Sequence, residues 1–131
     1  MQVMVDSNIL LSALLFPNGA VAKAFEKCIQ NYDLIICTYV IDECKRVVRK
    51  KFPKYIETLD SFLQNLAFEL VYTPTNPKPN LFEIRDKNDY PILYTAIKEN
   101  VDLFLTGDKD YYDIIIEKPI IVSPSTFLEK Y

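Results

Sequence analysis

Acidic residues stand at the ends of apolar runs in two distant parts of the chain. Asp6 ends the run Val3–Asp6, and Asp108 comes shortly after the run Val101–Thr106. Continuous apolar runs are typical of buried strands in a parallel sheet, and ligand sites in open α/β sheets form beyond the carboxyl ends of the strands. We therefore expect Asp6 and Asp108 to lie in one pocket at the edge of a sheet.

Two further acids open predicted helices that begin at the same edge. Glu43 lies in the first turns after the predicted strand Asp33–Cys37, and Asp89 lies at the start of the predicted helix Tyr90–Glu99. Asp86 comes three residues before Asp89 and can reach the same rim. Four separate chain segments would thus each bring a carboxylate to one pocket.

Carboxylates gathered in one pocket repel one another, and this repulsion raises their pKa values. A hard divalent cation, Mg²⁺ or Mn²⁺, suits such a cluster, because its ligands are all oxygens and the chain contains no His. The lack of His also excludes Ser-His-Asp triads and His-Cys zinc sites. Water on such an ion is a ready nucleophile, and the ion neutralises the charge that develops on a phosphodiester under attack. We therefore expect the pocket to support metal-assisted phosphodiester hydrolysis.

Each acid also has a purely structural explanation when it is considered alone. Asp6 is a reasonable turn acid with Asn8 satisfying the loop backbone, and Glu43 can pair with Arg46 one helical turn later. Asp89 is a good N-cap for the helix that follows it. What favours a site is that four acids meet at one edge, because clustering them costs stability.

The elements that must position these acids alternate between strands and helices. We predict helices over Ile9–Phe16, Ala20–Gln30, Tyr39–Phe52 with Thr38 as N-cap, Tyr55–Ala67 and Tyr90–Glu99, and strands over Val3–Asp6, Asp33–Cys37, Val101–Thr106 and Ile120–Val122, with Phe68–Tyr72 as an edge strand. This alternation indicates βαβ units. We expect a three-layer α/β/α fold with a mainly parallel sheet of four or five strands, formed as one domain by residues 1–131.

Composition narrows the class of protein further. The chain has 131 residues, of which 50% are hydrophobic and 25% charged, as is ordinary for a globular protein. It contains three Cys residues without a C-x-x-C motif, which argues against a disulfide framework and fits a reducing compartment, so we expect a cytoplasmic protein. We expect no membrane segment, because no apolar run approaches the 18 residues that a span requires and the first residues lack a basic region.

Basic residues are concentrated in one short segment of an otherwise acidic chain. Within Lys45–Lys54, the stripe Lys45, Arg46, Arg49 and Lys50 follows Glu43 on the same predicted helix, while the whole chain has a net charge of −3. A basic stripe of this kind is typical either of a limited contact with a phosphate backbone or of a solvated helix face. We interpret it as a candidate nucleic-acid contact.

Four motifs, in this order, resemble those of PIN-domain ribonucleases, and most closely the small single-domain toxins of prokaryotic toxin–antitoxin pairs. They are VMVDSNILLSALL, TYVIDECKRV, RDKNDYPILYTAI and VDLFLTGDKDY. The resemblance covers nearly the whole chain. It assigns the catalytic and metal-binding roles to Asp6, Glu43, Asp89 and Asp108, and secondary roles to Asn8, Asp86 and Thr106.

The resemblance also implies an activity and partners. It implies an endoribonuclease that depends on Mg²⁺ or Mn²⁺ and cleaves RNA, forms a homodimer and is inhibited by a cognate antitoxin protein. Two assignments stay open at this point. The helix register decides between Asp42 and Glu43, for which we choose Glu43, and either Asp86 or Asp89 is the direct metal ligand.

Two alternative functions compete with this interpretation. A receiver-type signalling module also gathers acids around Mg²⁺ in a doubly wound sheet, but it needs a Lys at the end of a late strand. Here Lys109 follows Asp108 directly and Lys118 precedes Pro119. A protein-interaction module that retains the acids without catalysis is the second alternative, and it predicts no saturable Mn²⁺ site.

Overall fold

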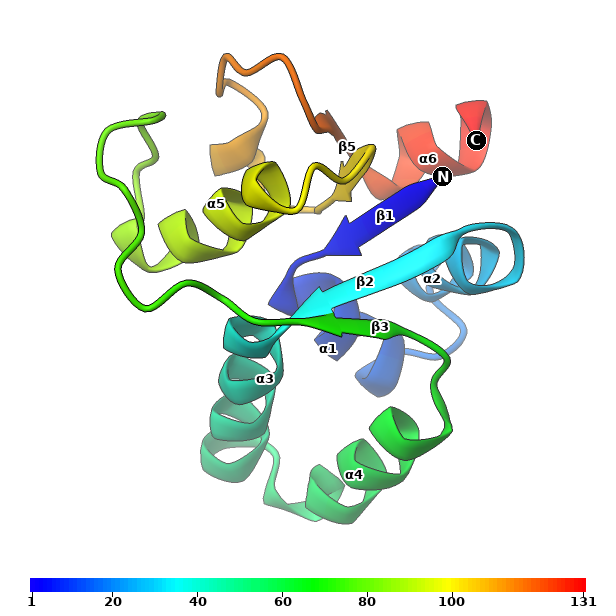
Figure 1. Ribbon diagram of the computed structural model, residues 1–131. Helices are drawn as coiled ribbons and strands as arrows, with labels where there is room; N and C mark the ends of the chain where they lie inside the picture. The colour runs from blue at the N-terminus through cyan, green and yellow to red at the C-terminus, as the bar shows by residue number, and fades with distance from the viewer.

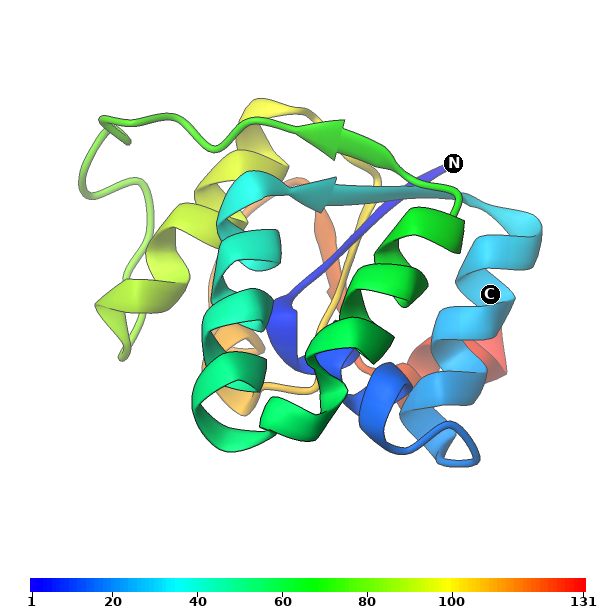
Figure 2. The same ribbon diagram turned by 90° about the horizontal axis from the view of Figure 1, so that it is seen from below.

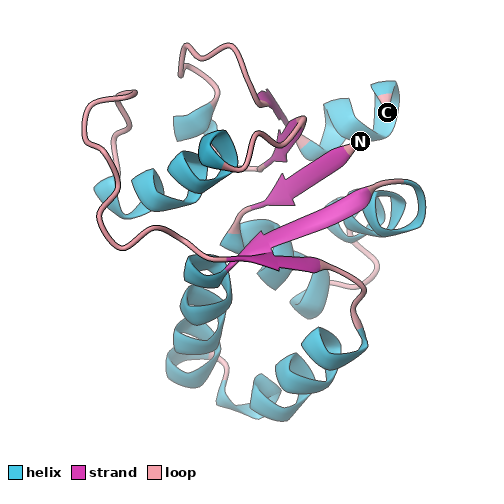
Figure 3. Ribbon diagram, in the orientation of Figure 1, coloured by secondary structure: helices cyan, strands magenta, loops and turns pink.

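The computed structural model describes all residues, Met1–Tyr131. Its centre is a five-stranded sheet in the order β3-β2-β1-β4-β5, and every neighbouring pair is parallel. The strands, which Figures 1 and 3 show as arrows, are β1 (Gln2–Val5), β2 (Asp33–Cys37), β3 (Glu69–Val71), β4 (Leu103–Leu105) and β5 (Ile120–Val122). The predicted strands are therefore all present, and β3 lies at an edge as expected.

Helices cover both faces of this sheet. They are α1 (Ser7–Leu15), α2 (Ala20–Asn31), α3 (Thr38–Lys51), α4 (Ile56–Asn65), α5 (Tyr90–Lys98) and α6 (Pro124–Lys130), with short 3₁₀ turns η1 (Pro53–Tyr55), η2 (Lys87–Asp89) and η3 (Lys109–Tyr111). On one face α1 packs against α2 and α3, and α3 packs against α4 (Figure 2). Helix α5 lies on the other face (Figure 1). This arrangement confirms the expected three-layer α/β/α fold with a parallel sheet.

Strand β1 lies at the centre of the sheet and sets the position of the site. Val3, Met4 and Val5 are fully buried, because the strand has neighbours on both sides and helices on both faces. Its register with β4 pairs Val5 with Leu105. The residues that follow this pair, Asp6 and Thr106, therefore leave the sheet side by side.

The start of α3 differs from the prediction, and the predicted N-cap role of Thr38 is wrong. Cys37 occupies the N-cap position, and Thr38 is already helical. The Thr38 hydroxyl instead accepts a hydrogen bond from the Thr73 N–H (3.0 Å), and the Thr73 hydroxyl accepts one from the Tyr39 N–H (3.1 Å). This reciprocal pair ties the start of α3 to the segment that leaves β3.

No single helix combines the length and the apolar character that a membrane span requires. Only α1 and α2 taken together, with a bend of 108° between them, reach those limits.

Candidate metal-binding active site

Asp6 and Thr106 form the buried centre of the site at the carboxyl ends of β1 and β4. Asp6 is only 3% exposed and Thr106 is fully buried. The Thr106 hydroxyl donates a hydrogen bond to one oxygen of the Asp6 carboxylate, and the Ile9 N–H donates one to the other oxygen (3.0 Å). Asp6 therefore caps α1 as a structural residue would, and it also places a carboxylate at the sheet edge.

Glu43 reaches the same edge from α3. The Ser7 hydroxyl donates a hydrogen bond to the Glu43 carboxylate, and the Arg46 guanidinium lies 3.7 Å from its other oxygen. Asp42, the alternative in this helix, is exposed to solvent. The register of α3 thus turns Glu43 toward the residue that follows Asp6.

Asp89, Asp108 and Asp110 approach one another most closely. Each offers a carboxyl oxygen, and the three oxygens lie within 4.8 Å of one another. Asp108 caps η3 by accepting a hydrogen bond from the Asp110 N–H (2.9 Å), and its own N–H donates to the Thr106 hydroxyl (3.0 Å). This single hydroxyl therefore connects Asp6 with the turn that carries two more acids.

The structure distinguishes the roles of Asp86 and Asp89. Asp86 caps η2, because its carboxylate accepts a hydrogen bond from the Asn88 N–H (3.0 Å). Asp89 occupies the N-cap position of α5, but its side chain makes no capping bond and faces Asp108 and Asp110. The capping role predicted for Asp89 is thus taken by Asp86, one turn earlier, and the geometry favours Asp89 as the direct ligand.

The pKa values of Asp6 and Asp89 reflect burial and the charges of the neighbouring acids. Burial raises the pKa of Asp6 to about 6, with further contributions from the charges of Asp108 and Glu43, while the Thr106 hydroxyl opposes the rise. Burial also raises the pKa of Asp89 to about 7, followed by repulsion from Asp86, Asp108, Glu43 and Asp6. Without a metal, the site therefore disfavours the state in which all of its carboxylates are ionised.

Two tyrosines support the site from the segment after β4. Tyr111 is buried, and its hydroxyl donates to the carbonyl of Asp89 (3.2 Å). Burial, and then the charges of Asp89 and Asp6, raise the pKa of Tyr111, so its hydroxyl stays protonated. The Tyr112 hydroxyl donates to the Thr106 carbonyl (2.8 Å). Both tyrosine hydroxyls therefore fix backbone carbonyls next to the acidic cluster.

The remaining predicted residues lie outside this cluster. Asn8 is exposed, and so are Lys45, Arg49 and Lys50 on α3. Arg46 is the residue of the basic stripe that contacts a site acid. The stripe thus begins beside Glu43 and leads along α3 away from the carboxylates.

Sequence reasoning missed two residues of the cluster, Asp110 and Arg85. Asp110 is half-buried, and the Arg85 guanidinium, from the loop before η2, binds its carboxylate at 2.9 Å. The spacing of Asp108 and Asp110 was the available signal for the first, since an acid that caps a short turn brings the acid two residues later beside it. No local pattern identifies Arg85.

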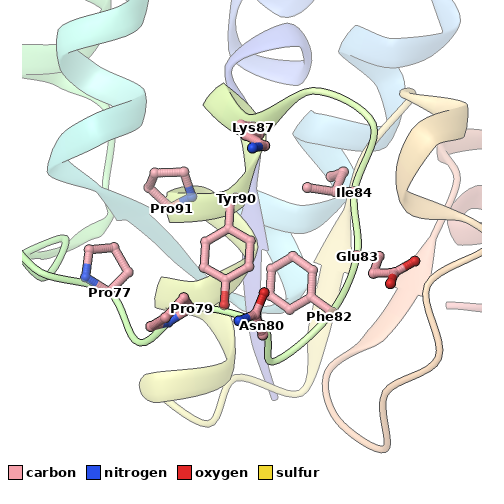
Figure 4. Close-up of a pocket in the computed structure, with 9 residues that line it drawn as sticks. All are labelled: Pro77, Pro79, Asn80, Phe82, Glu83, Ile84, Lys87, Tyr90 and Pro91. Carbon is pink, nitrogen blue, oxygen red and sulfur yellow. The ribbon is translucent and has the colours of Figure 1, made fainter.

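A hollow of about 550 Å³ lies at the start of α5 (Figure 4). Prolines and the stacked rings of Phe82 and Tyr90, whose centroids are 4.4 Å apart, form its walls. The Tyr90 hydroxyl donates to the Lys78 carbonyl (2.6 Å), which fixes the ring in place. None of the four predicted acids lines this hollow, so the carboxylate cluster is a separate feature.

The donor atoms of the cluster fit a hard divalent cation. Carboxylate oxygens are its ligands, and no nitrogen or sulfur ligand competes, because the chain lacks His and its three cysteines are buried. Mg²⁺ and Mn²⁺ prefer such oxygen ligands. The three acids of the cluster, with Asp6 and Glu43 near enough to raise the pKa of Asp89, are therefore suited to hold one of these ions.

The fold and the acidic edge of the sheet agree with a comparison to known families. The model of the PIN domain family matches residues 2–110, a range that includes every acid of the cluster, and the chain belongs to this family. An uncharacterised protein of Methanocaldococcus jannaschii, MJ1680, is 28% identical over 145 residues, which cover 99% of this chain and 91% of that protein.

Two solved structures share the fold. One is VapBC2 from Rickettsia felis bound to a DNA fragment from their promoter, with a TM-score of 0.71 and 22% identity over 94% of this chain and 98% of that chain. The other is DNA-bound VapBC from Salmonella typhimurium, with a TM-score of 0.68 and 12% identity over 95% of this chain and 98% of that chain.

Proposed function

We propose that the protein is an endoribonuclease that hydrolyses RNA phosphodiester bonds with Mg²⁺ or Mn²⁺, and that it is the toxin of a toxin–antitoxin pair. The observation that carries the proposal is the gathering of Asp89, Asp108 and Asp110 beside Asp6 and Glu43. Membership of the PIN domain family, whose members are generally nucleases, supports it. We propose residues 1–131 as one nuclease domain.

In this proposal Asp6, Glu43, Asp89 and Asp108 hold the ion, and Asp110 assists. When bound, the ion would supply an activated water and would neutralise charge on the phosphate under attack. Thr106 fixes Asp6 and the turn of Asp108 through one hydroxyl. Ser7 orients Glu43 in the same way, and ligands held by such neighbours keep their geometry as substrate binds.

We also propose that Lys45, Arg46, Arg49 and Lys50 contact the RNA backbone. The stripe begins at Glu43, so it is continuous with the acidic cluster. Replacing Arg49 and Lys50 together by Ala should lower RNA affinity and reduce the slope of log affinity against log salt by about 1.4, because each phosphate contact on a single strand contributes about 0.7. An unchanged slope would show that the stripe is a solvated helix face.

The two solved neighbours suggest the partners that we propose. Both are VapBC assemblies bound to DNA, and we propose a cognate antitoxin partner and a homodimer for this chain. Large apolar side chains are available for such contacts, since Phe16 is 65% exposed, Tyr72 76% and Ile115 95%. Light scattering of the purified protein measures the oligomeric state directly.

The receiver-type alternative conflicts with the order of the strands. In a receiver-like sheet the order is 2-1-3-4-5, which places the first strand beside the third. Here β1 lies between β2 and β4, and β3 is an edge strand. A non-catalytic interaction module is the alternative that the experiment below must exclude.

The experiment that tests the proposal is cleavage of a labelled RNA oligonucleotide with Mn²⁺ or Mg²⁺, with EDTA and a DNA oligonucleotide as controls. We expect cleavage that EDTA abolishes. Asp6→Asn and Asp108→Asn should each lower the rate by about 10³-fold, because loss of a ligand removes several kcal/mol of charge stabilisation. Asp102→Asn makes the same change at the other end of the sheet and should leave the rate unchanged. Equal rates in all of these proteins, or a parent that cuts no RNA, would contradict the proposal.

A further inference from the structure

Arg85 is the residue at the carboxylate cluster that no role described above explains. Its Nε and one terminal nitrogen both contact the same Asp110 oxygen, Oδ2, at 3.0 Å and 2.9 Å. Arg85 donates no hydrogen bond to the other Asp110 oxygen. One oxygen of the Asp110 carboxylate is therefore held by a cation, while the same carboxylate belongs to the cluster with Asp89 and Asp108.

Arg85 is held by an ion pair that a substrate phosphate can displace. Its side chain is 82% exposed, whereas that of Asp110 is 21% exposed. Ion pairs with so exposed a partner are weak and exchange readily. The guanidinium keeps further donors free, and its planar fork matches the two non-bridging oxygens of a phosphodiester.

The negative charge of the site creates a need for a cation that can bind the substrate phosphate. Acids surround the position that a scissile phosphate would occupy, and their charges repel it. Three ion pairs exist in the structure, and that of Arg85 with Asp110 places a cation directly against the three-acid cluster. A divalent ion bound there would share the charge of the Asp110 carboxylate and repel the guanidinium, and it would thereby weaken the ion pair and release Arg85 beside the phosphate.

We propose that Arg85 is the phosphate-binding residue of the active site, stored on Asp110 in the free protein and transferred to the scissile phosphate when metal and RNA bind. This inference rests on the proposed function. It assigns to Asp110 a second task besides metal binding, that of keeping Arg85 within reach of the substrate.

The test compares Arg85→Ala and Arg85→Lys with Lys87→Ala. Lys87 is exposed two residues further along the chain and forms no ion pair, so its loss removes the same charge without touching the cluster. Two quantities are measured in each protein: the Mn²⁺ affinity without RNA, and kcat and KM for RNA cleavage. For Arg85→Ala we expect kcat/KM to fall by about 10²-fold, as for the loss of a transition-state donor. Its Mn²⁺ affinity should rise about threefold, because a weakly paired competing cation is gone.

The other variants separate phosphate binding from support of Asp110. Lysine can still pair with Asp110 but cannot form the fork, so Arg85→Lys should keep the parent Mn²⁺ affinity and lose most of kcat. Lys87→Ala should stay within about twofold of the parent in both quantities, as expected of a surface charge away from the chemistry. If Arg85→Ala weakens Mn²⁺ binding and Arg85→Lys restores both quantities, Arg85 only positions Asp110 and the inference is wrong. Parent-like cleavage by Arg85→Ala overturns the inference alone, whereas a parent that cuts no RNA overturns the proposed function as well.

Discussion

The two ends of the β1–β4 pair carry aspartates in opposite electrostatic situations. At the amino end, Asp102 accepts a hydrogen bond from the Gln2 N–H (2.8 Å) and lies 3.4 Å from the Lys118 ammonium. These partners, the backbone bond first, lower the pKa of Asp102. At the carboxyl end, burial raises the pKa of Asp6 to about 6 despite two hydrogen bonds.

This difference separates aspartates whose charge stabilises the folded chain from aspartates whose charge destabilises it. Asp102 is exposed to water and has a cationic neighbour, so its charge is favourable. Asp6 is buried among other acids, and its charge is unfavourable until a cation is present. Natural proteins tolerate such local conflicts mainly where function requires them. The charge of Asp6 at the carboxyl end of this sheet therefore needs a bound cation to become favourable, whereas Asp102 at the amino end stabilises the fold by itself.

The largest effect that we expect from this contrast is on stability against pH. The folded pKa of Asp6 lies above the value of 3.8 for the free group, so the folded state binds more protons in this window and loses stability as the pH rises through it. Between pH 4 and 7 Asp6 alone should cost about 2 kcal/mol of unfolding free energy. Asp89 has the same sign, with a smaller contribution because it is half-exposed.

Denaturant unfolding in EDTA across this pH range measures the loss of unfolding free energy. Two controls assign this loss to Asp6 and to the absence of metal. Asp6→Asn should flatten the profile, because an amide does not titrate. Mn²⁺ should stabilise the parent more at neutral than at acid pH, since protons and metal compete for the same carboxylates. A metal-free protein whose stability does not fall with rising pH would contradict the unfavourable charge at Asp6.

A second prediction concerns the hydroxyl that connects the acids. Thr106→Val keeps the shape of the side chain but removes the hydroxyl that donates to Asp6 and accepts from the Asp108 N–H. Loss of such a supporting group should lower Mn²⁺ affinity or the rate of RNA cleavage by about 10- to 100-fold. Titration with Mn²⁺ and cleavage kinetics measure the two effects, and Thr106→Ser, which restores the hydroxyl, should recover most of both.

The smallest effect should come from the amino end. Asp102→Asn removes the ion pair with Lys118 and the charge-assisted bond to Gln2, so we expect a small decrease in Tm at neutral pH and an unchanged cleavage rate. The decrease should vanish at low pH, because the lowered pKa of Asp102 gives stability that is lost as the carboxylate takes up a proton. A lower rate with an unchanged Tm would reverse the roles that we assign to the two ends.

Apolar runs and acid positions in the sequence were sufficient to predict much of this architecture. The strand over Asp33–Cys37 has the predicted bounds, because its last four residues form one buried apolar run after the exposed Asp33. The choice of Glu43 over Asp42 follows from the apolar stripe of α3, which leaves Asp42 facing solvent. Patterns with a helical or strand period predict which side of an element a residue takes.

Contacts between distant segments could not be predicted in this way. Thr38 resembles an N-cap, but a partner from beyond β3 takes its hydroxyl, and the cap position shifts to Cys37. Asp89 also resembles an N-cap, but Asp86 caps the preceding turn and the Asp89 side chain makes no capping bond. Arg85 lies 25 residues from Asp110 in the chain. Local preference places such residues at turns, and only the folded chain decides their partners.

The parallel pairing of β1 with β4 also sets the moment at which the centre exists during synthesis. Asp6 emerges from the ribosome early, but its partner Thr106 is 100 residues later in the chain, and Asp108 and Asp110 follow still later. Domains fold as units once their strands are available. A nascent chain therefore carries an incomplete centre until β4 and the turn η3 that follows it have been made, and the hydrolysis that we propose has to wait for both.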